Sequence, residues 1–118
     1  MTHLVFIHGM YMNAASWDAW RNRAEAAGHT TTAIEWPGHE GNPADLRANP
    51  PEILRTLTFP DLVDKHEREI RAIDGPVTLV GHSIGGLLVQ ALLARGLGAA
   101  GVAISPAPPS GSWSPCRG

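Results

Sequence analysis

The feature of this sequence best suited to chemistry is a serine flanked by glycines, Ser83 within Gly81-His82-Ser83-Ile84-Gly85. A short apolar run, Val77–Val80, precedes it, and apolar residues at helical spacing follow from Ile84 onward. This order predicts a strand, a sharp turn and a helix, a context that raises a serine hydroxyl above the sheet, where it can attack a carbonyl carbon. We therefore predict that Ser83 is a catalytic nucleophile.

The glycines around Ser83 fit the backbone that such a turn requires. Gly81 and Gly85 stand where the chain is strained and where neighbouring backbone would pass too close for a β-carbon. Gly86 is expected to let the helix pack closely on the sheet. The alternative is a tight strand-to-helix turn in a plain α/β domain without catalysis.

A serine nucleophile needs two backbone donors for the negative oxygen of the tetrahedral intermediate. The N–H of Ile84, directly after the nucleophile, is the first candidate. The second is the N–H of Met10, because Gly9 lets the chain turn sharply after a first strand that would lie beside the strand before Ser83. Met10 and Ile84 are thus the predicted oxyanion hole.

The histidines offer weaker candidates. For His8 we expect hydrogen bonds to loop backbone rather than proton transfer, and for His82 a place packed beneath the turn. His39 and Glu40 are adjacent in a loop, where a solvated pair is expected rather than a catalytic base. No histidine, acid or the single Cys116 has metal-ligand spacing, so we expect no metal and no cofactor.

The remaining pattern alternates strands with helices. Strands are predicted at Leu4–Ile7, Thr30–Trp36, Val77–Val80 and Ala99–Ile104. Helices are predicted from Ser16 to Ala27, from a capping box at Thr58 and Asp61 to Ile73, and from Ile84 to Leu92, whereas the proline-rich residues 37–57 are expected to be irregular. Trp17, Trp20 and Trp36 are expected in the core or in a cleft wall.

This alternation predicts the α/β class, with a parallel sheet of about four strands and helices on both faces. The chain has 118 residues, of which 43% are hydrophobic, enough for a single domain. Its formal net charge of -2 gives no reason to expect a nucleic-acid partner, and no apolar run reaches the length of a membrane span. With no leader sequence evident at the start, we expect a cytoplasmic protein.

Three segments together carry a family resemblance: LVFIHGMYMNAASW, WPGHEGN and PVTLVGHSIGGLLVQALLARG. They resemble the α/β-hydrolase superfamily of serine esterases and lipases over essentially residues 3–109. The resemblance implies a sheet in the order second, first, third, fourth strand, and hydrolysis of a carboxylic ester or related acyl compound, with a small-molecule acyl substrate.

One departure from that family bears on activity. The family pattern requires an acid and a histidine after the nucleophile, and no Asp, Glu or His follows Ser83. We therefore expect residues 1–109 to form a partial, truncated α/β-hydrolase domain of impaired activity, and residues 110–118 to form a disordered tail.

The same departure leaves other functions open. A catalytically silent fragment or interaction module is one alternative, and a cofactor-independent lyase or perhydrolase is another, since the family hosts both chemistries. The last strand would present an open apolar edge, which predicts self-association.

Overall fold

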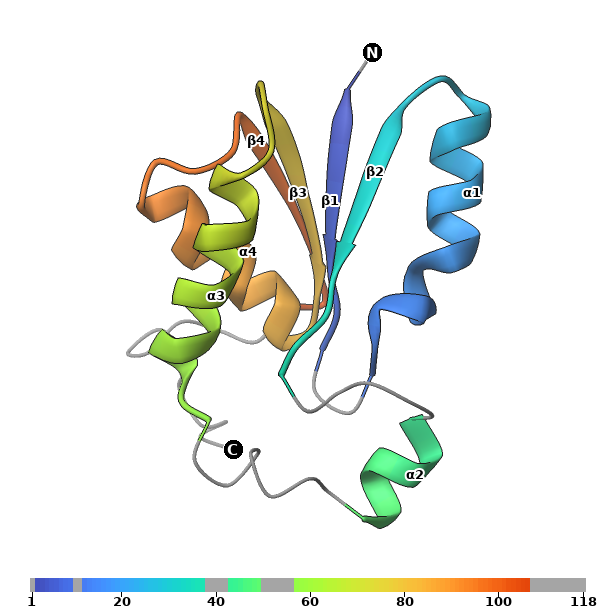
Figure 1. Ribbon diagram of the computed structural model, residues 1–118, viewed down its shortest axis with the longest axis vertical. Helices are drawn as coiled ribbons and strands as arrows, with labels where there is room; N and C mark the ends of the chain where they lie inside the picture. Colours follow the sequence, from blue (N-terminus) through green and yellow to red (C-terminus); the bar gives the residue numbers. More distant parts are fainter. Residues whose placement is uncertain (1, 10–11, 38–42, 50–56, 107–118) are drawn as a thin grey trace, which may run out of the picture.

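The computed structural model describes residues 2–9, 12–37, 43–49 and 57–106. Their secondary structure is β1 (His3–Ile7), η1 (Ala14–Trp17), α1 (Asp18–Ala26), β2 (Thr30–Ile34), α2 (Pro43–Ala48), α3 (Phe59–Arg71), β3 (Val77–His82), α4 (Ile84–Ala94) and β4 (Ala100–Ile104). Figure 1 shows the four strands side by side, with α1 on one side of the sheet and α3 and α4 on the other.

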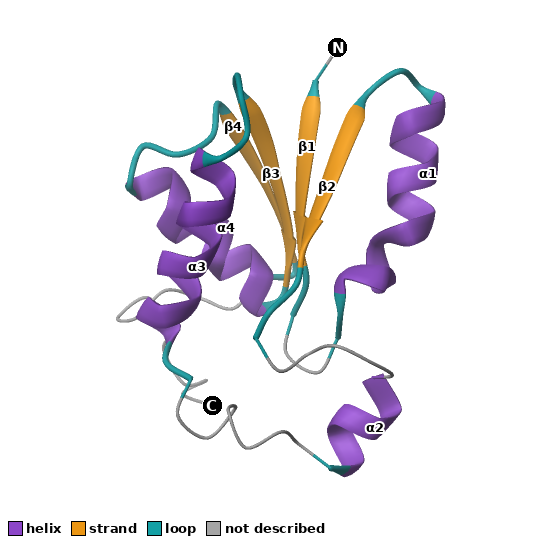
Figure 2. Cartoon of the chain, in the orientation of Figure 1, coloured by secondary structure: helices purple, strands orange, loops and turns teal. Residues whose placement is uncertain are grey.

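The sheet is parallel and runs in the order β2-β1-β3-β4, as the sequence predicts. Because all four strands point the same way, their carboxyl ends meet at one edge of the sheet, as the arrows of Figure 2 show. In open α/β sheets this edge is where ligands bind. Both segments that the sequence singles out, the one after Ile7 and the one after Val80, lie at this carboxyl edge.

Successive side chains along each strand point to opposite faces of the sheet, so the buried residues form two separate clusters. On the face covered by α3 and α4, the cluster includes Val5, Ile7, Leu79 and Leu88. On the face covered by α1, it is much smaller and consists of Phe6, Trp17 and Val80. The two faces of β3 and β4 are therefore unequally covered.

Residues 37–57 were expected to be irregular, and that expectation is wrong for Pro43–Ala48, which form α2. Proline is tolerated in the first turn of a helix, where its missing N–H would have no partner, and Asp45 and Arg47 complement the helix dipole. A proline in this segment therefore begins a helix instead of breaking the chain. Residues 38–42 and 50–56 lie outside the described part of the chain.

The other elements follow the predicted pattern with small shifts at their ends. The capping box of α3 is present: the Thr58 side chain accepts from the Asp61 amide at 3.2 Å, and the Thr58 amide donates to the Asp61 carboxylate at 3.1 Å. β2 ends at Ile34 rather than Trp36, because its partner β1 ends at Ile7, opposite Ile34 in the register. β3 continues through His82, two residues beyond the predicted end.

Candidate active site

The turn at Ser83 has the strained backbone that the sequence predicts. Ser83 lies between β3 and α4 with φ 57° and ψ -120°, a conformation that an L-residue rarely adopts. Its amide donates to the carbonyl of Ile104 at 3.1 Å, and its own carbonyl accepts from the Gly86 amide at 2.9 Å. These bonds to β4 and α4 hold the strained residue in place.

Two glycines allow the turn to close. A β-carbon on Gly81 would overlap the backbone of Gly85, and one on Gly85 would overlap the carbonyl oxygen of Ile7 and lie 2.8 Å from that of His8. The predicted close passage of backbone is thus confirmed at both positions. At Gly86 a β-carbon would lie 2.8 Å from the β-carbon of Pro106, so this glycine lets α4 approach the end of β4.

The side chain of Ser83 is half-buried and lies beside the segment after β1. A β-carbon on Gly9 would stand 3.3 Å from the Ser83 β-carbon and 3.9 Å from its hydroxyl oxygen. The structure thus brings Gly9 and Ser83 together, although they are far apart in the sequence.

Of the two predicted oxyanion donors, one lies in the described part of the chain. Ile84 is the first residue of α4, so its N–H has no carbonyl four residues earlier in the helix to pair with. The free N–H groups and the positive end of the helix dipole favour negative charge near Ser83. Met10 lies outside the described residues, and so do Tyr11, His39 and Glu40.

His8 is held by the loop backbone, as expected. It is 1% exposed; its Nδ1 lies 2.8 Å from the Gly9 carbonyl, and its Nε2 accepts from the Trp36 amide at 3.1 Å. Because Nε2 accepts, Nδ1 carries the proton and donates to Gly9. Both ring nitrogens are therefore used in positioning the Gly9 segment and the end of β2.

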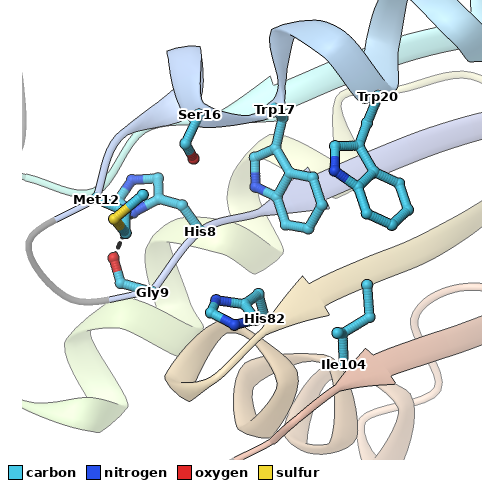
Figure 3. A pocket seen from close by; sticks show the side chains of 8 residues that line it. All are labelled: His8, Gly9, Met12, Ser16, Trp17, Trp20, His82 and Ile104. Carbon is cyan, nitrogen blue, oxygen red and sulfur yellow. Dashed lines mark hydrogen bonds between the residues drawn. The ribbon is translucent and has the colours of Figure 1, made fainter.

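The expectation that His82 packs beneath the turn is wrong. Its side chain is exposed and lines a cavity of about 160 Å³ at the carboxyl edge of the sheet, drawn in Figure 3. The reason is the extra length of β3: alternation along the strand puts His82 on the same face as Val80, where α1 does not reach over it. Extending the predicted strand by two residues would have revealed this.

The three tryptophans in the described part of the chain divide between core and cleft wall, as expected. Trp36 and Trp17 are buried, at 1% and 4% exposure, whereas Trp20 is 53% exposed. Trp17 and Trp20 line the cavity that His82 also lines, so two of these residues form a cleft wall.

A positioned base for Ser83 is not found within residues 2–9, 12–37, 43–49 and 57–106, where no hydrogen bond to its hydroxyl is present. In the same ranges no group of three or more His, Cys, Asp or Glu side chains could hold a metal ion. No helix there is long and apolar enough to cross a membrane.

Comparison with known proteins decides the family. Residues 4–117 match the profile of the Alpha/beta hydrolase family. The chain belongs to the alpha/beta hydrolase family. Its parallel four-stranded sheet, with helices on both faces, is a partial version of that fold.

Individual members of the family resemble the chain in sequence. Salicylic acid-binding protein 2 from Nicotiana tabacum is 38% identical over 85 residues, which are 72% of this chain and 31% of that protein. Methylesterase 3 from Arabidopsis thaliana is 30% identical over 91 residues, again 72% of this chain and 31% of the relative. The chain therefore spans about a third of the length of these curated relatives.

Solved structures agree on the fold. Polyneuridine aldehyde esterase superposes with a TM-score of 0.65 at 27% identity, covering 90% of this chain and 40% of that one. An extracellular alpha/beta-hydrolase from a Paenibacillus species gives a TM-score of 0.72 at 24% identity, covering 92% of this chain and 42% of that one.

Proposed function

We propose that this chain carries the nucleophile of a serine hydrolase that cleaves a carboxylic ester or a related acyl compound. The observation that carries the proposal is the strained backbone of Ser83, held at the start of α4 with its hydroxyl beside Gly9. Strain of this kind persists only where the surrounding structure imposes it, and it serves to present a reactive side chain.

In this proposal the Ser83 oxygen attacks the carbonyl carbon of the ester. The N–H of Ile84 then donates to the oxygen that becomes negative, and the N–H of Met10 is the predicted second donor. The acyl group is transferred to Ser83, the alcohol leaves with a proton, and water releases the acid in a second step. No cofactor is required by this chemistry.

The family relatives support an ester as the substrate class. One similar protein is named as a methylesterase, and a similar solved structure is an esterase. We extend ester hydrolysis to this chain because residues 4–117, which match the family profile, include the Ser83 turn.

The proposal is tested with p-nitrophenyl acetate and the purified chain at neutral pH. A slow turnover is expected because no base is positioned to activate the Ser83 hydroxyl, and Ser83→Ala should lower the rate further, to what the oxyanion donors alone sustain. Ser16→Ala is the matched control, since Ser16 is an exposed serine in ordinary backbone whose hydroxyl donates to the Asn13 carbonyl. Equal turnover by the Ser83→Ala variant would overturn the proposal.

A second candidate is a catalytically silent interaction module, favoured by the exposed strand β4. This strand pairs with β3 on one side, and its sequence, Ala-Gly-Val-Ala-Ile, carries no charge or proline to discourage further pairing. Three exposed large hydrophobic side chains lie around it: Val102 on the strand, Trp20 across the groove that both line, and Leu93, which packs at Gly101. Self-association through this edge is the activity this candidate predicts.

A further inference from the structure

Two neighbouring residues after β2 hold the two ends of the segment that follows β1. The amide of Trp36 donates to His8 Nε2 at 3.1 Å, and His8 Nδ1 donates to the Gly9 carbonyl at 2.8 Å. Figure 3 draws the second of these bonds as a dashed line. At the other end of the segment, the amide of Ala14 donates to the Glu35 carboxylate at 2.6 Å. The segment from Gly9 to Ala14 is thus tied at both ends to one pair of consecutive residues.

The Gly9 end of this segment borders the nucleophile turn. A β-carbon on Gly9 would stand 3.3 Å from the Ser83 β-carbon. The Gly9 carbonyl accepts from the Met12 amide at 3.2 Å as well as from His8. Because a peptide group is planar and trans, the N–H that follows a carbonyl points the opposite way from it. The orientation of the Gly9 carbonyl therefore sets the direction of the N–H of Met10, the predicted second oxyanion donor.

At the Ala14 end, the Glu35 carboxylate caps the helix η1. Asn13 stands at the N-cap position, but its side chain makes no capping hydrogen bond. The first N–H groups of a helix have no partner within it and carry partial positive charge, so a carboxylate is a favourable acceptor there. Hydrogen bonds to an ionised acceptor are about twice as strong as those between neutral groups. The bond from Ala14 to Glu35 is therefore a strong tie between η1 and the end of β2.

The backbone of Glu35 is itself fixed. Glu35 follows directly after Ile34, the last residue of β2, which pairs with the last residue of β1. Lys65 of α3 donates from its Nζ to the Glu35 backbone carbonyl and also lies 3.5 Å from the Glu69 carboxylate. The carboxylate that holds Ala14 thus extends from backbone that the sheet and α3 both hold.

We propose that Glu35 is a positioning residue for the oxyanion hole, because its carboxylate holds the Ala14 end of the segment that carries Met10. The inference rests on the proposed hydrolysis at Ser83 and adds to it a residue that acts through another. When the carboxylate is removed, the Ala14 end loses this tie and the Met10 N–H is held less firmly in one direction. A purely capping role would change stability alone, whereas a positioning role also lowers kcat.

Three variants separate the acceptor oxygen from the charge and from carboxylates in general. Glu35→Ala removes the acceptor, and Glu35→Gln keeps a side-chain oxygen of the same reach. Glu25→Ala is the matched control, since Glu25 on α1 also bonds to a β2 residue, accepting from the Thr31 hydroxyl at 2.6 Å.

The first measurement is turnover of p-nitrophenyl acetate. We expect Glu35→Ala to lower kcat about ten-fold with KM nearly unchanged, a part of the roughly 10²- to 10³-fold cost of losing an oxyanion donor outright. Glu35→Gln should stay within about three-fold of the unmodified chain, because its amide oxygen still accepts from Ala14. Glu25→Ala should match the unmodified chain.

The second measurement tests the positioning without any hydrolysis, by ¹H–¹⁵N spectra in a Ser83→Ala background. The Ala14 amide should exchange with solvent more slowly than in the urea-unfolded chain, and Glu35→Ala should speed this exchange about ten-fold or more. The Met10 amide signal should move in Glu35→Ala and stay in place in Glu25→Ala. The exchange rate of Ala14 with Glu35 intact can be read even if Glu35→Ala fails to fold.

Four results would each overturn the inference: an unchanged kcat in Glu35→Ala, an equal loss of kcat in Glu25→Ala, an Ala14 amide that exchanges as in the unfolded chain, or a Met10 signal that does not respond to Glu35→Ala. The proposed hydrolysis fails separately, if Ser83→Ala leaves ester turnover unchanged. In that case the two amide signals still decide whether Glu35 holds the segment.

Discussion

Gly85 packs directly against Ile7: a β-carbon on the glycine would overlap the carbonyl oxygen at the end of β1. This contact joins the first turn of α4 to the strand beside β3. It fixes how closely the Ser83 turn approaches the Gly9 segment, because Gly9 follows the same strand.

Gly85→Ala should therefore destabilise the protein by about 3 kcal/mol in urea denaturation, since backbone atoms on both sides must move. Gly96→Ala is the control: φ there is +81°, but nothing lies within 4 Å of the added carbon. The free energy of unfolding of that variant should fall by about 1–2 kcal/mol, the penalty of a left-handed backbone alone. A smaller loss for Gly85→Ala than for Gly96→Ala would contradict the close contact.

Much of this arrangement could be predicted from the sequence, because apolar runs, the capping residues Thr58 and Asp61, and the glycines around Ser83 act locally. The position of His82 could not, because it depends on how far β3 pairs with β4, where His82 lies opposite Ile104. The bond from Ala14 to Glu35 is also invisible in the sequence, since it depends on which segment lies beside the end of β2.

The burial of His66 leads us to expect that the protein loses stability in acid. It is fully buried in α3, its Nδ1–H donates to the Leu62 carbonyl at 2.7 Å, and burial lowers its pKa from 6.5 to about 4 despite that bond. Lys65 lowers the pKa further by charge repulsion.

The direction in which stability changes with pH follows from proton binding. Between pH 6.5 and about 4 the unfolded chain takes up a proton at His66 that the folded chain does not, so folding weakens as the pH falls through this window. The loss should reach about 3 kcal/mol by the lower limit. Urea denaturation at several pH values across this range should show a weaker pH dependence of stability for His66→Leu than for the unmodified chain. An unchanged pH dependence in His66→Leu would refute the assignment.

The exposed edge of β4 predicts association between copies of the chain. Val102 is 49% exposed in the middle of this strand, so Val102→Lys places a charge where a second strand would pair. Sedimentation velocity should show concentration-dependent association of the unmodified chain that this variant reduces. Ala26→Lys, at the exposed end of α1, is the control and should associate like the unmodified chain. A monomer at all concentrations would exclude the interaction candidate.

The central claim is that the fold presents the Ser83 hydroxyl as a nucleophile, and covalent labelling tests it most directly. After long incubation of the folded chain with a fluorophosphonate, peptide mapping should find the adduct on Ser83 in preference to the exposed Ser16 and Ser105, and unfolding in urea should remove that preference. Labelling spread equally over the three serines, or absent from Ser83, would contradict the account.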